Sequence, residues 1–453
     1  MGLRGTGLVA YGLPGLPLAL LGLPLYVYLP TFYAESLGLP LALVGAMLLL
    51  ARGLDVLTDP LIGLLSDRGH RLGRKAFIAL GVPLLLLGIE YLFRPAGTPG
   101  GLYLLAWTLV AYLGWTLISV PYGAWGAELP RGPDGYHARS RLAASREGFM
   151  ILGTLAAVAL PAILGIAEDA GATLAQFATL LWWLLPLAVA IALWRVPAAP
   201  AAGLNASPQG GWRVLLDTLR GDAHGRRLLL AYLLNGIANG LPATLFLLFV
   251  THNLQAPGWT GGLLAAYFVS GVLALPAWLW LARRIDKARA WAASMLVASL
   301  AFLTVPWLGP GDAGLFLVIC LVSGLGLGAD LALPASIQAD LAMRRQARDG
   351  APRAGAWFGL WGMVTKLALA LAVGIAFPLL ALAGLDPEAG PEPSLALGLL
   401  YGGLPILFKL AACALAWRLP RLDTDTPTPE DSHAPSTHPG GARRPAAVGP
   451  DGL

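Results

Sequence analysis

Twelve predominantly apolar stretches, each about as long as a bilayer is thick, constrain the fold of this chain more than any other feature. A hydrocarbon core of about 30 Å takes about 20 apolar residues in a helix. Only 12% of the 453 residues are charged, roughly half the share in soluble domains, which excludes a soluble globular protein. We therefore expect an all-α membrane protein with helices at 8–34, 39–66, 76–93, 101–128, 146–167, 174–196, 228–252, 259–282, 289–309, 313–341, 355–384 and 394–418.

Signals for processing, disulfides, metal binding and catalysis are weak. The first stretch is too long for a cleavable signal peptide and carries four prolines, so we expect it to stay in the membrane. Cys320 and Cys413 lie in separate stretches, which argues against a disulfide or a structural metal site. The six histidines lie in loops, at span ends or in the tail. With no nucleophile–base pair or phosphate loop, we expect neither an enzyme nor a cofactor.

The basic residues define an orientation. Lys and Arg precede the first stretch, follow the last one and concentrate in every second connection, whereas the other connections carry acids and only one base, Arg94. The positive-inside rule then predicts that both termini are cytoplasmic, in a bacterial inner membrane protein with several spans. The net charge of +5 is the sum of these loop charges and requires no nucleic-acid partner.

The chain divides into two halves of six spans. Residues 197–227, rich in Pro, Ala and Gly and then basic, form the longest internal connection and separate bundles at 1–196 and 228–421. Each half has a basic turn after its second span, and Glu128 in the first half has an echo in Asp340. This repeat predicts the major facilitator fold, with substrate between the halves. Residues 422–453 are expected to be a disordered cytoplasmic tail.

Asp55 and Asp59 are the strongest candidates for function. They lie four residues apart in an apolar stretch, so they share one helix face, with Thr58 on its flank. A buried charge at this depth costs roughly 3 kcal/mol or more, which marks a functional site. Their oxygens suit a monovalent cation, or the pair could share a proton. Alternatively, each carboxylate only pairs with a buried base such as Arg52 or Arg146.

The turn that follows this stretch is a candidate for conformational gating. Gly63 permits close helix approach. The charged residues of the turn could form a relay that stabilises one conformation, or they could serve only as topology signals. These residues are Asp67, Arg68, Arg74 and Lys75.

These motifs resemble the glycoside–pentoside–hexuronide:cation symporter family, which includes the melibiose permeases. The resemblance rests on the Asp55-x3-Asp59-Pro60-x2-Gly63-x3-Asp67 pattern closed by Gly73-Arg74-Lys75. Four further segments agree in the same order along the chain: 121–124 with 128–129, 139–148, 338–340 and 361–366. The resemblance implies a cation site made by Asp55, Thr58, Asp59 and Thr116. It also places Lys366 opposite the acidic cluster, as a coupling residue paired with Asp55 or Asp59.

The same resemblance leaves the substrate open. Arg146 stands where the family has a sugar-contacting arginine, although it could be only a topology charge. Galactoside-binding members carry a Lys–Asp pair where this chain has Leu18 and Ala19, and an Asp where it has Ser119. Aromatic residues could stack on a sugar or mark the membrane interface. The expected substrate-binding residues are Arg146, Ser119, Tyr122 and Trp361.

We therefore expect a Na⁺- or H⁺-coupled secondary transporter of a small sugar or sugar-like solute, working by alternating access as a monomer. Its partners would be the solute, the coupling cation and membrane lipids. Two alternatives stay open: an exporter or translocator of an amphipathic, lipid-like substrate on the same fold, and a non-transporting membrane sensor.

Overall fold

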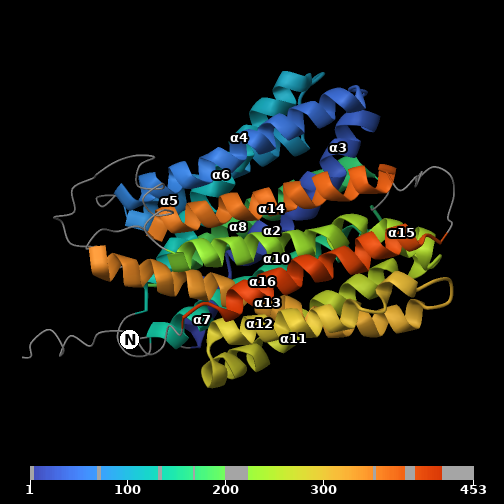
Figure 1. Cartoon of the computed structure of the whole chain (residues 1–453). Coiled ribbons are helices and arrows are strands. Elements are labelled where there is room, and N and C mark those ends of the chain that lie inside the picture. The colour runs from blue at the N-terminus through green and yellow to red at the C-terminus, as the bar shows by residue number, and fades with distance from the viewer. Residues whose placement is uncertain are drawn as a thin grey trace, which may run out of the picture.

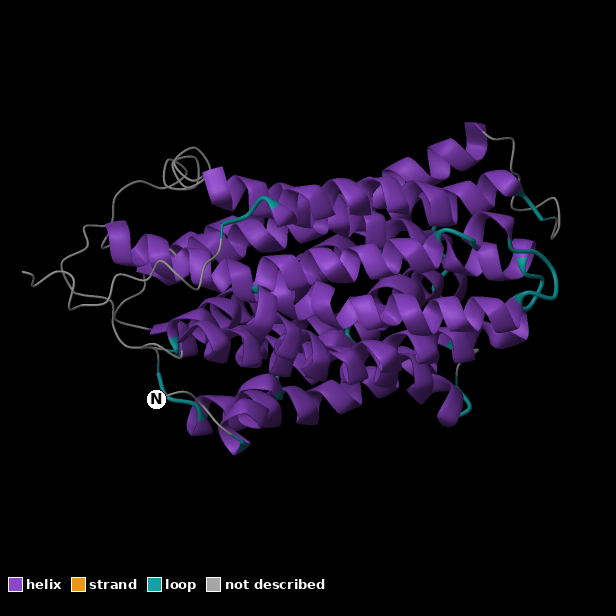
Figure 2. Cartoon of the chain, turned by 60° about the horizontal axis from the view of Figure 1, so that its bottom comes forward, coloured by secondary structure: helices purple, strands orange, loops and turns teal. Residues whose placement is uncertain are grey.

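The computed structural model describes residues 5–68, 73–130, 135–166, 169–198, 223–349, 354–382 and 393–420. These residues form long helices that run side by side, and no strand occurs among them (Figures 1 and 2). The predicted tail at 422–453 and residues 199–222 of the predicted linker lie outside the described part.

The first membrane segment is a chain of short helical pieces. Proline removes an N–H donor and clashes with the preceding turn, and this segment contains four prolines. Its pieces include two π-helical turns, η1 and η2; in order they are α1 (Thr6–Gly12), α2 (Gly15–Leu20), η1 (Pro24–Tyr28), α3 (Leu29–Thr31) and η2 (Phe32–Ser36).

The remaining segments are mostly continuous helices. The first half continues with α4 (Leu41–Arg68), α5 (Gly73–Phe93), α6 (Gly101–Glu128), α7 (Gly135–Ile163) and α8 (Ala170–Arg195). The second half contains α10 (Ala223–Leu248) with η3 (Phe249–Asn253), η4 (Pro257–Trp259) with α11 (Thr260–Ile285), α12 (Lys287–Phe302) with η5 (Val305–Trp307), α13 (Ala313–Asp349), α14 (Ala354–Leu382), and α15 (Leu395–Gly398) with η6 (Leu399–Gly403) and α16 (Leu404–Trp417).

Twelve membrane segments agree with the sequence prediction. Eleven helical segments of the described residues are long and apolar enough to cross a membrane. The twelfth is α4, whose 28 residues are long enough to span but include several charges. The helix that carries the candidate site therefore differs from the other segments by the charges inside its apolar stretch.

Two predicted boundaries were wrong. We expected helices to begin at 146 and to end at 341, but α7 begins at Gly135 and α13 continues to Asp349. Arg139 and Arg141 are therefore helical rather than part of a loop. A prediction from hydropathy places the helix boundary where the apolar run ends. These helices continue beyond that point, because their polar ends pack against the opposite half.

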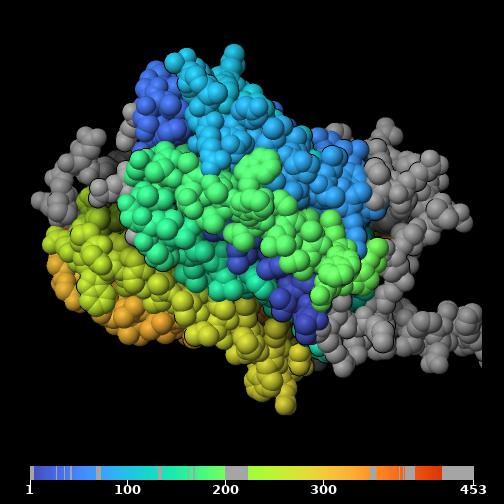
Figure 3. Space-filling view, turned by 180° about the vertical axis from the view of Figure 1, so that it is seen from behind, coloured from blue at the N-terminus to red at the C-terminus, as the bar shows by residue number. Residues whose placement is uncertain are grey.

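Each half has large hydrophobic clusters of its own, and smaller clusters, such as Ile62 with Phe358 and Ala144 with Leu275, contain residues of both halves. The buried residues of one cluster run from Ala10 to Val196, and those of two others come only from 228–419. Seen from behind, the first half lies above the second (Figure 3). The halves meet mainly where α14 packs on α4 and α6, and where α7 packs on α11 and α13.

The charged helix ends gather at one end of the bundle. We call it the basic end; there α4 ends at Arg68, α5 begins with Gly73-Arg74-Lys75 and α12 begins at Lys287. The far end is where α5 ends at Phe93 and α6 begins at Gly101.

Candidate functional site

Helices α4 and α14 pack closely through glycines that both helices contribute. A Cβ added at Gly63 would lie 2.8 Å from the carbonyl carbon of Gly355, and one at Gly359 would lie 2.8 Å from the Cα of Pro60. Such separations are too short for real side chains, so the two backbones touch only because these positions are glycine. The predicted role of Gly63 is confirmed. The contact brings the acidic face of α4 against the other half of the protein.

Lys366 on α14 bridges the two carboxylates of α4. Its Nζ lies 2.6 Å from Asp55 Oδ2 and 2.9 Å from Asp59 Oδ1. Asp59 is fully buried and Asp55 is 6% exposed. The predicted pairing of Lys366 with this cluster is confirmed. The alternative partners lie elsewhere: the Arg52 guanidinium is 4.3 Å from the Tyr26 ring centroid, and Arg146 pairs with Glu147.

Two threonines complete the oxygen-rich cluster. Thr116 on α6 donates to Asp59 Oδ1 at 2.8 Å and lies 3.4 Å from Asp55 Oδ1. Thr58 donates to the Asp55 carbonyl at 2.8 Å and lies 3.4 Å from Asp55 Oδ1. All four predicted cation-site residues therefore lie together, from α4 and α6, with Lys366 opposite them.

With both carboxylates ionised, the cluster carries one negative charge more than Lys366 neutralises, and one of its oxygens is free. Two carboxylates face a single ammonium, and Lys366 is the ion-pair partner of both among the described residues. Asp59 Oδ2 is buried and has no hydrogen-bond partner within that part of the chain. An unpaired buried carboxylate oxygen is costly. A monovalent cation or a proton at this oxygen would both neutralise the cluster and satisfy it.

Gly362 provides the space beside this oxygen. A Cβ at position 362 would lie 3.0 Å from Asp59 Cγ and closer still to Oδ2. We predict that Gly362→Ala lowers the midpoint of thermal unfolding, because overpacking costs about 1–3 kcal/mol. Gly374→Ala is the matched control on the same helix, since a Cβ there meets nothing within 4 Å. Equal midpoints for the two variants would contradict the tight contact.

Asp67 ties α4 to the first turn of α14 at the basic end. Its two oxygens accept from the backbone N–H groups of Gly355 and Ala356, both at 2.7 Å. These donors have no intrahelical acceptor, and the helix dipole favours an anion there. The Arg74 guanidinium pairs with Asp67 at 2.6 Å and with Glu128 at 2.7 Å. The predicted charge relay therefore exists, and it joins the two halves.

The other two predicted gating residues, Lys75 and Arg68, have no described contact with the other half. Lys75 donates to the carbonyls of Leu193 and Val196, both at 2.6 Å, at the C-terminal end of α8. It therefore stabilises a helix end inside the first half. Arg68 is the last residue of α4, and its side chain lies outside the described part of the structure.

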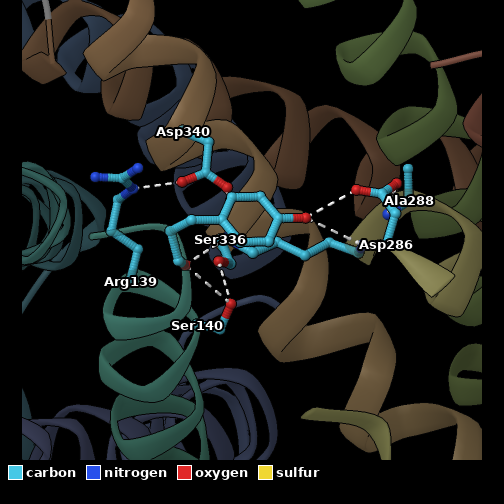
Figure 4. Close-up of polar contacts among 8 residues, drawn as sticks. Arg139, Ser140, Asp286, Ala288, Ser336 and Asp340 are labelled. Carbon is cyan, nitrogen blue, oxygen red and sulfur yellow. Dashed lines mark hydrogen bonds and ion pairs between the residues drawn. The ribbon is translucent and has the colours of Figure 1, made fainter. Parts of the chain in front are cut away.

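A second charged network joins the halves around Asp340 (Figure 4). Asp340 on α13 pairs with Arg139 of α7 and with Lys287 of α12. The Lys287 ammonium also donates to the Tyr136 carbonyl at 2.7 Å, and the Tyr136 hydroxyl donates to Asp286 at 2.8 Å. The sequence echo of Glu128 in Asp340 thus has a structural counterpart, because each carboxylate pairs with the first turn of the preceding helix in its own half.

The four predicted substrate-binding residues have different immediate partners in the structure. Arg146 donates to Glu147 at 2.6 and 3.0 Å. Tyr122 is 2% exposed, and its ring lies 4.9 Å from that of Tyr11. Trp361 on α14 stacks on Tyr232 at 3.6 Å between centroids. Their roles in substrate binding stay predictions.

Ser119 is the predicted substrate residue with free hydrogen-bonding capacity. Its hydroxyl on α6 is buried and finds no partner among the described residues. It lies about one helical turn from Thr116, on the same side of α6. A solute hydroxyl in reach of Ser119 would therefore lie close to the carboxylate cluster.

Sequence reasoning missed a second buried charge pair. Lys409 on α16 lies 3.0 Å from Asp330 on α13, and both side chains are less than a tenth exposed. The signal was available, because both residues stand inside predicted apolar stretches. The argument that selected Asp55 and Asp59 applies to them equally.

Two six-helix halves, with an acidic cluster and charged contacts between them, define a membrane transporter of the major facilitator class, not an enzyme. The sequence model of the family described as "MFS/sugar transport protein" matches residues 10–422. The chain belongs to this family, and the predicted resemblance is thereby confirmed.

Relatives of this chain include named symporters and carriers. The glucuronide carrier protein homolog of Escherichia coli is 22% identical over 410 residues, which are 88% of each chain. An uncharacterized symporter of Synechocystis is 31% identical over 169 residues, 35% of this chain and 30% of the relative.

Solved structures share the fold. The Escherichia coli fucose:proton symporter has a TM-score of 0.57 at 15% identity, covering 89% of this chain and 99% of that one. A bacterial homologue of the iron transporter ferroportin, in an outward-facing state, has a TM-score of 0.66 at 16% identity, covering 92% and 99%.

Proposed function

We propose that this protein is a cation-coupled secondary transporter of a sugar or sugar-like solute. The observation that carries the proposal is one ammonium, Lys366, facing two buried carboxylates, Asp55 and Asp59, which leaves a residual negative charge when both carboxylates are ionised. A Na⁺ ion or a proton at Asp59 Oδ2 would neutralise it. Because Lys366 belongs to α14 and the carboxylates to α4, binding of the cation would alter the attraction between the two halves.

Coupling follows from this position. A cation and a solute are coupled only when both prefer the same conformation, and the effect is reciprocal. A cation that satisfies Asp59 weakens the hold of that carboxylate on Lys366. The halves can then rearrange around a solute bound between them, and alternating access follows from rocking of one half against the other.

The basic end gives the orientation of the protein in the membrane. The same cycle can serve uptake or export. With the basic end in the cytoplasm, both termini are cytoplasmic in a bacterial inner membrane. The charged contacts at Asp67 and Asp340 then close the cytoplasmic side in the described conformation. A monomer is part of the same proposal.

Relatives guide the choice of solute. The curated and structural relatives include a carrier named for glucuronide and a symporter named for fucose. Arg146 is a candidate contact for a carboxylate-bearing sugar if Glu147 releases it, and Ser119 offers a hydroxyl to a neutral one. The first solutes to test are therefore hexuronates and neutral hexoses or deoxyhexoses.

The test is uptake by proteoliposomes under imposed gradients. Labelled hexuronates and neutral sugars are added outside, with an inward Na⁺ gradient or an inward proton gradient. We predict accumulation of one solute class above its equilibrium level under one of the two gradients. An ionophore that collapses that gradient is the control and should return the solute to equilibrium. Failure of both gradients to move any member of the panel would contradict the proposal.

A further inference from the structure

The second half of the protein encloses a cavity of its own. About 360 Å³ of space lies among α10, α11, α12, α13 and α16, which run together in the lower part of Figure 1. At ~30 Å³ for each water in the liquid, this space equals roughly a dozen waters. No residue of the Asp55–Asp59 cluster lines it, so it is separate from the cation site.

The walls and the deep end of this cavity differ in chemistry. Toward the far end the walls include Phe246, Leu263, Phe302 and Phe316, near the far-end termini of their helices. Lys409 and Asp330 lie deeper, in the middle of α16 and α13. The cavity therefore presents an apolar channel that leads to a charged floor.

The floor is a built polar network. The Lys409 ammonium donates to Asp330 at 3.0 Å, Asn239 at 2.6 Å and Asn235 at 3.1 Å. Asp330 also accepts from Trp291 at 2.8 Å and from the Asn239 amide at 3.0 Å. All three Lys409 hydrogens are used, so the ammonium is not free to bind an anion.

Hydrogen-bonding capacity remains at three residues that line the cavity. Asp330 Oδ1 accepts one donor and can take a second, and the Asn239 amide has a second hydrogen. Ser299 lines the same cavity, is 4% exposed, and its hydroxyl has no partner among the described residues. Groups that both donate and accept, such as the two hydroxyls of a diol, can bond to donors and acceptors of this kind.

Charge selects against ions at this floor. Lys409 and Asp330 neutralise each other, so a ligand with net charge would add an uncompensated charge to a buried site, which is costly. An apolar body, by contrast, gains about 25 cal/mol for each Å² of apolar surface removed from water.

We propose that this cavity binds a neutral amphipathic molecule, with a hydroxylated head at Asp330, Asn239 and Ser299 and an apolar body along Phe246 and Phe316. This site belongs to the second half alone and does not rest on the proposed transport function. It gives the protein a binding site for an amphipath beside the pathway for a sugar-like solute.

The experiment measures binding of 1-O-hexylglycerol to the full chain in lipid nanodiscs, followed by the midpoint of thermal unfolding and by titration calorimetry. This probe has a diol head and an alkyl body and is not a sugar. We predict a saturable rise of the midpoint with hexylglycerol. Glycerol, hexanoate and hexylamine should bind at least tenfold more weakly.

Variants place the binding at the cavity. Ser299→Ala should weaken hexylglycerol binding about 2- to 12-fold, the worth of one hydrogen bond. Ser294→Ala is the matched control on α12, because Ser294 is buried but already donates to the Trp291 carbonyl. The double variant Asp330→Asn with Lys409→Gln removes both charges without leaving one unpaired, and it should weaken binding by about tenfold or more.

Three results would overturn the proposal. The first is no saturable binding of hexylglycerol by the unaltered protein. The second is equal affinity of Ser299→Ala, the double variant and Ser294→Ala, which would locate the probe elsewhere. The third is tighter binding of hexanoate or hexylamine, which would show that the floor selects an ion. Asp59→Asn should leave hexylglycerol binding unchanged, and this separates the cavity from the cation site.

Discussion

Replacing Asp59 by asparagine is expected to abolish cation-driven accumulation while the protein still inserts and folds. The substitution keeps the shape of the side chain but removes the residual negative charge of the cluster, and Lys366 retains Asp55 at 2.6 Å. Loss of an interaction with a charged group, worth about 1.5–3 kcal/mol, corresponds to roughly 10- to 150-fold weaker cation binding. Two measurements check this: accumulation in proteoliposomes, and the dependence of the unfolding midpoint on Na⁺ and on pH.

Glu90→Gln is the matched control for this variant. Glu90 lies near the far end of α5 and forms an ion pair at 3.2 Å with Arg94, which directly follows that helix. This pair lies away from the acidic cluster. Its neutralisation should leave accumulation and the cation dependence intact. Uphill uptake by Asp59→Asn at the unaltered rate would refute the proposed coupling site.

The second large effect is expected at Asp340. Asp340→Asn would leave the fully buried Lys287 and its neighbour Arg139 without their shared carboxylate. Breaking a buried ion pair on one side costs about 3–5 kcal/mol. Because Arg139 belongs to the first half and Lys287 to the second, part of this cost falls on the closed contact at the basic end, and we expect the halves to separate there.

Cross-linking measures that separation. The hydroxyls of Ser140 and Ser336 lie 2.9 Å apart across the two halves. In a background with Cys320→Ala and Cys413→Ala, the pair Ser140→Cys and Ser336→Cys should form a disulfide rapidly. Asp340→Asn should slow this reaction by at least about tenfold, since 1.4 kcal/mol already corresponds to that factor.

Two further variants make the result specific. Asp312→Asn removes a carboxylate from the far end, where it accepts from the Gly309 N–H, and should leave the cross-linking rate unchanged. Asp340→Asn combined with Lys287→Met removes the carboxylate together with the fully buried ammonium, leaves only the charge of the partly exposed Arg139, and should restore part of the rate. Rapid cross-linking in Asp340→Asn alone would show that this network does not hold the basic end closed.

Hydropathy and charge were sufficient to predict the number of helices and the repeat. Apolar runs of about 20 residues have few alternatives to a membrane helix. The same signal failed at the ends of α7 and α13, where polar residues continue the helix beyond the apolar run. Those turns are stabilised by partners in the other half, and pairs so distant in sequence leave no local pattern.

The candidate cation site was predictable because the free-energy cost of a carboxylate in an apolar membrane helix can be recognised from the local sequence. Asp55 and Asp59 stand out in an apolar stretch whatever their partners, and their spacing alone places them on one face. The contributions of Thr116 and Lys366 came from family resemblance, and the structure brings both to within hydrogen-bonding distance of Asp59. The same local cost marks Asp330 and Lys409, so the second charge pair was equally visible.

The sequence by itself determined that this chain spans the membrane twelve times in two related halves, with two costly carboxylates on its second span. Only the tertiary structure decided that one ammonium serves both carboxylates, that Asp59 keeps an unpaired oxygen, and that Asp67 and Asp340 join the halves. The reason is physical. The free energy of burying an apolar helix depends on the local sequence. The pairing of buried charges depends instead on which helices pack together. The glycine contacts between α4 and α14 determine that packing.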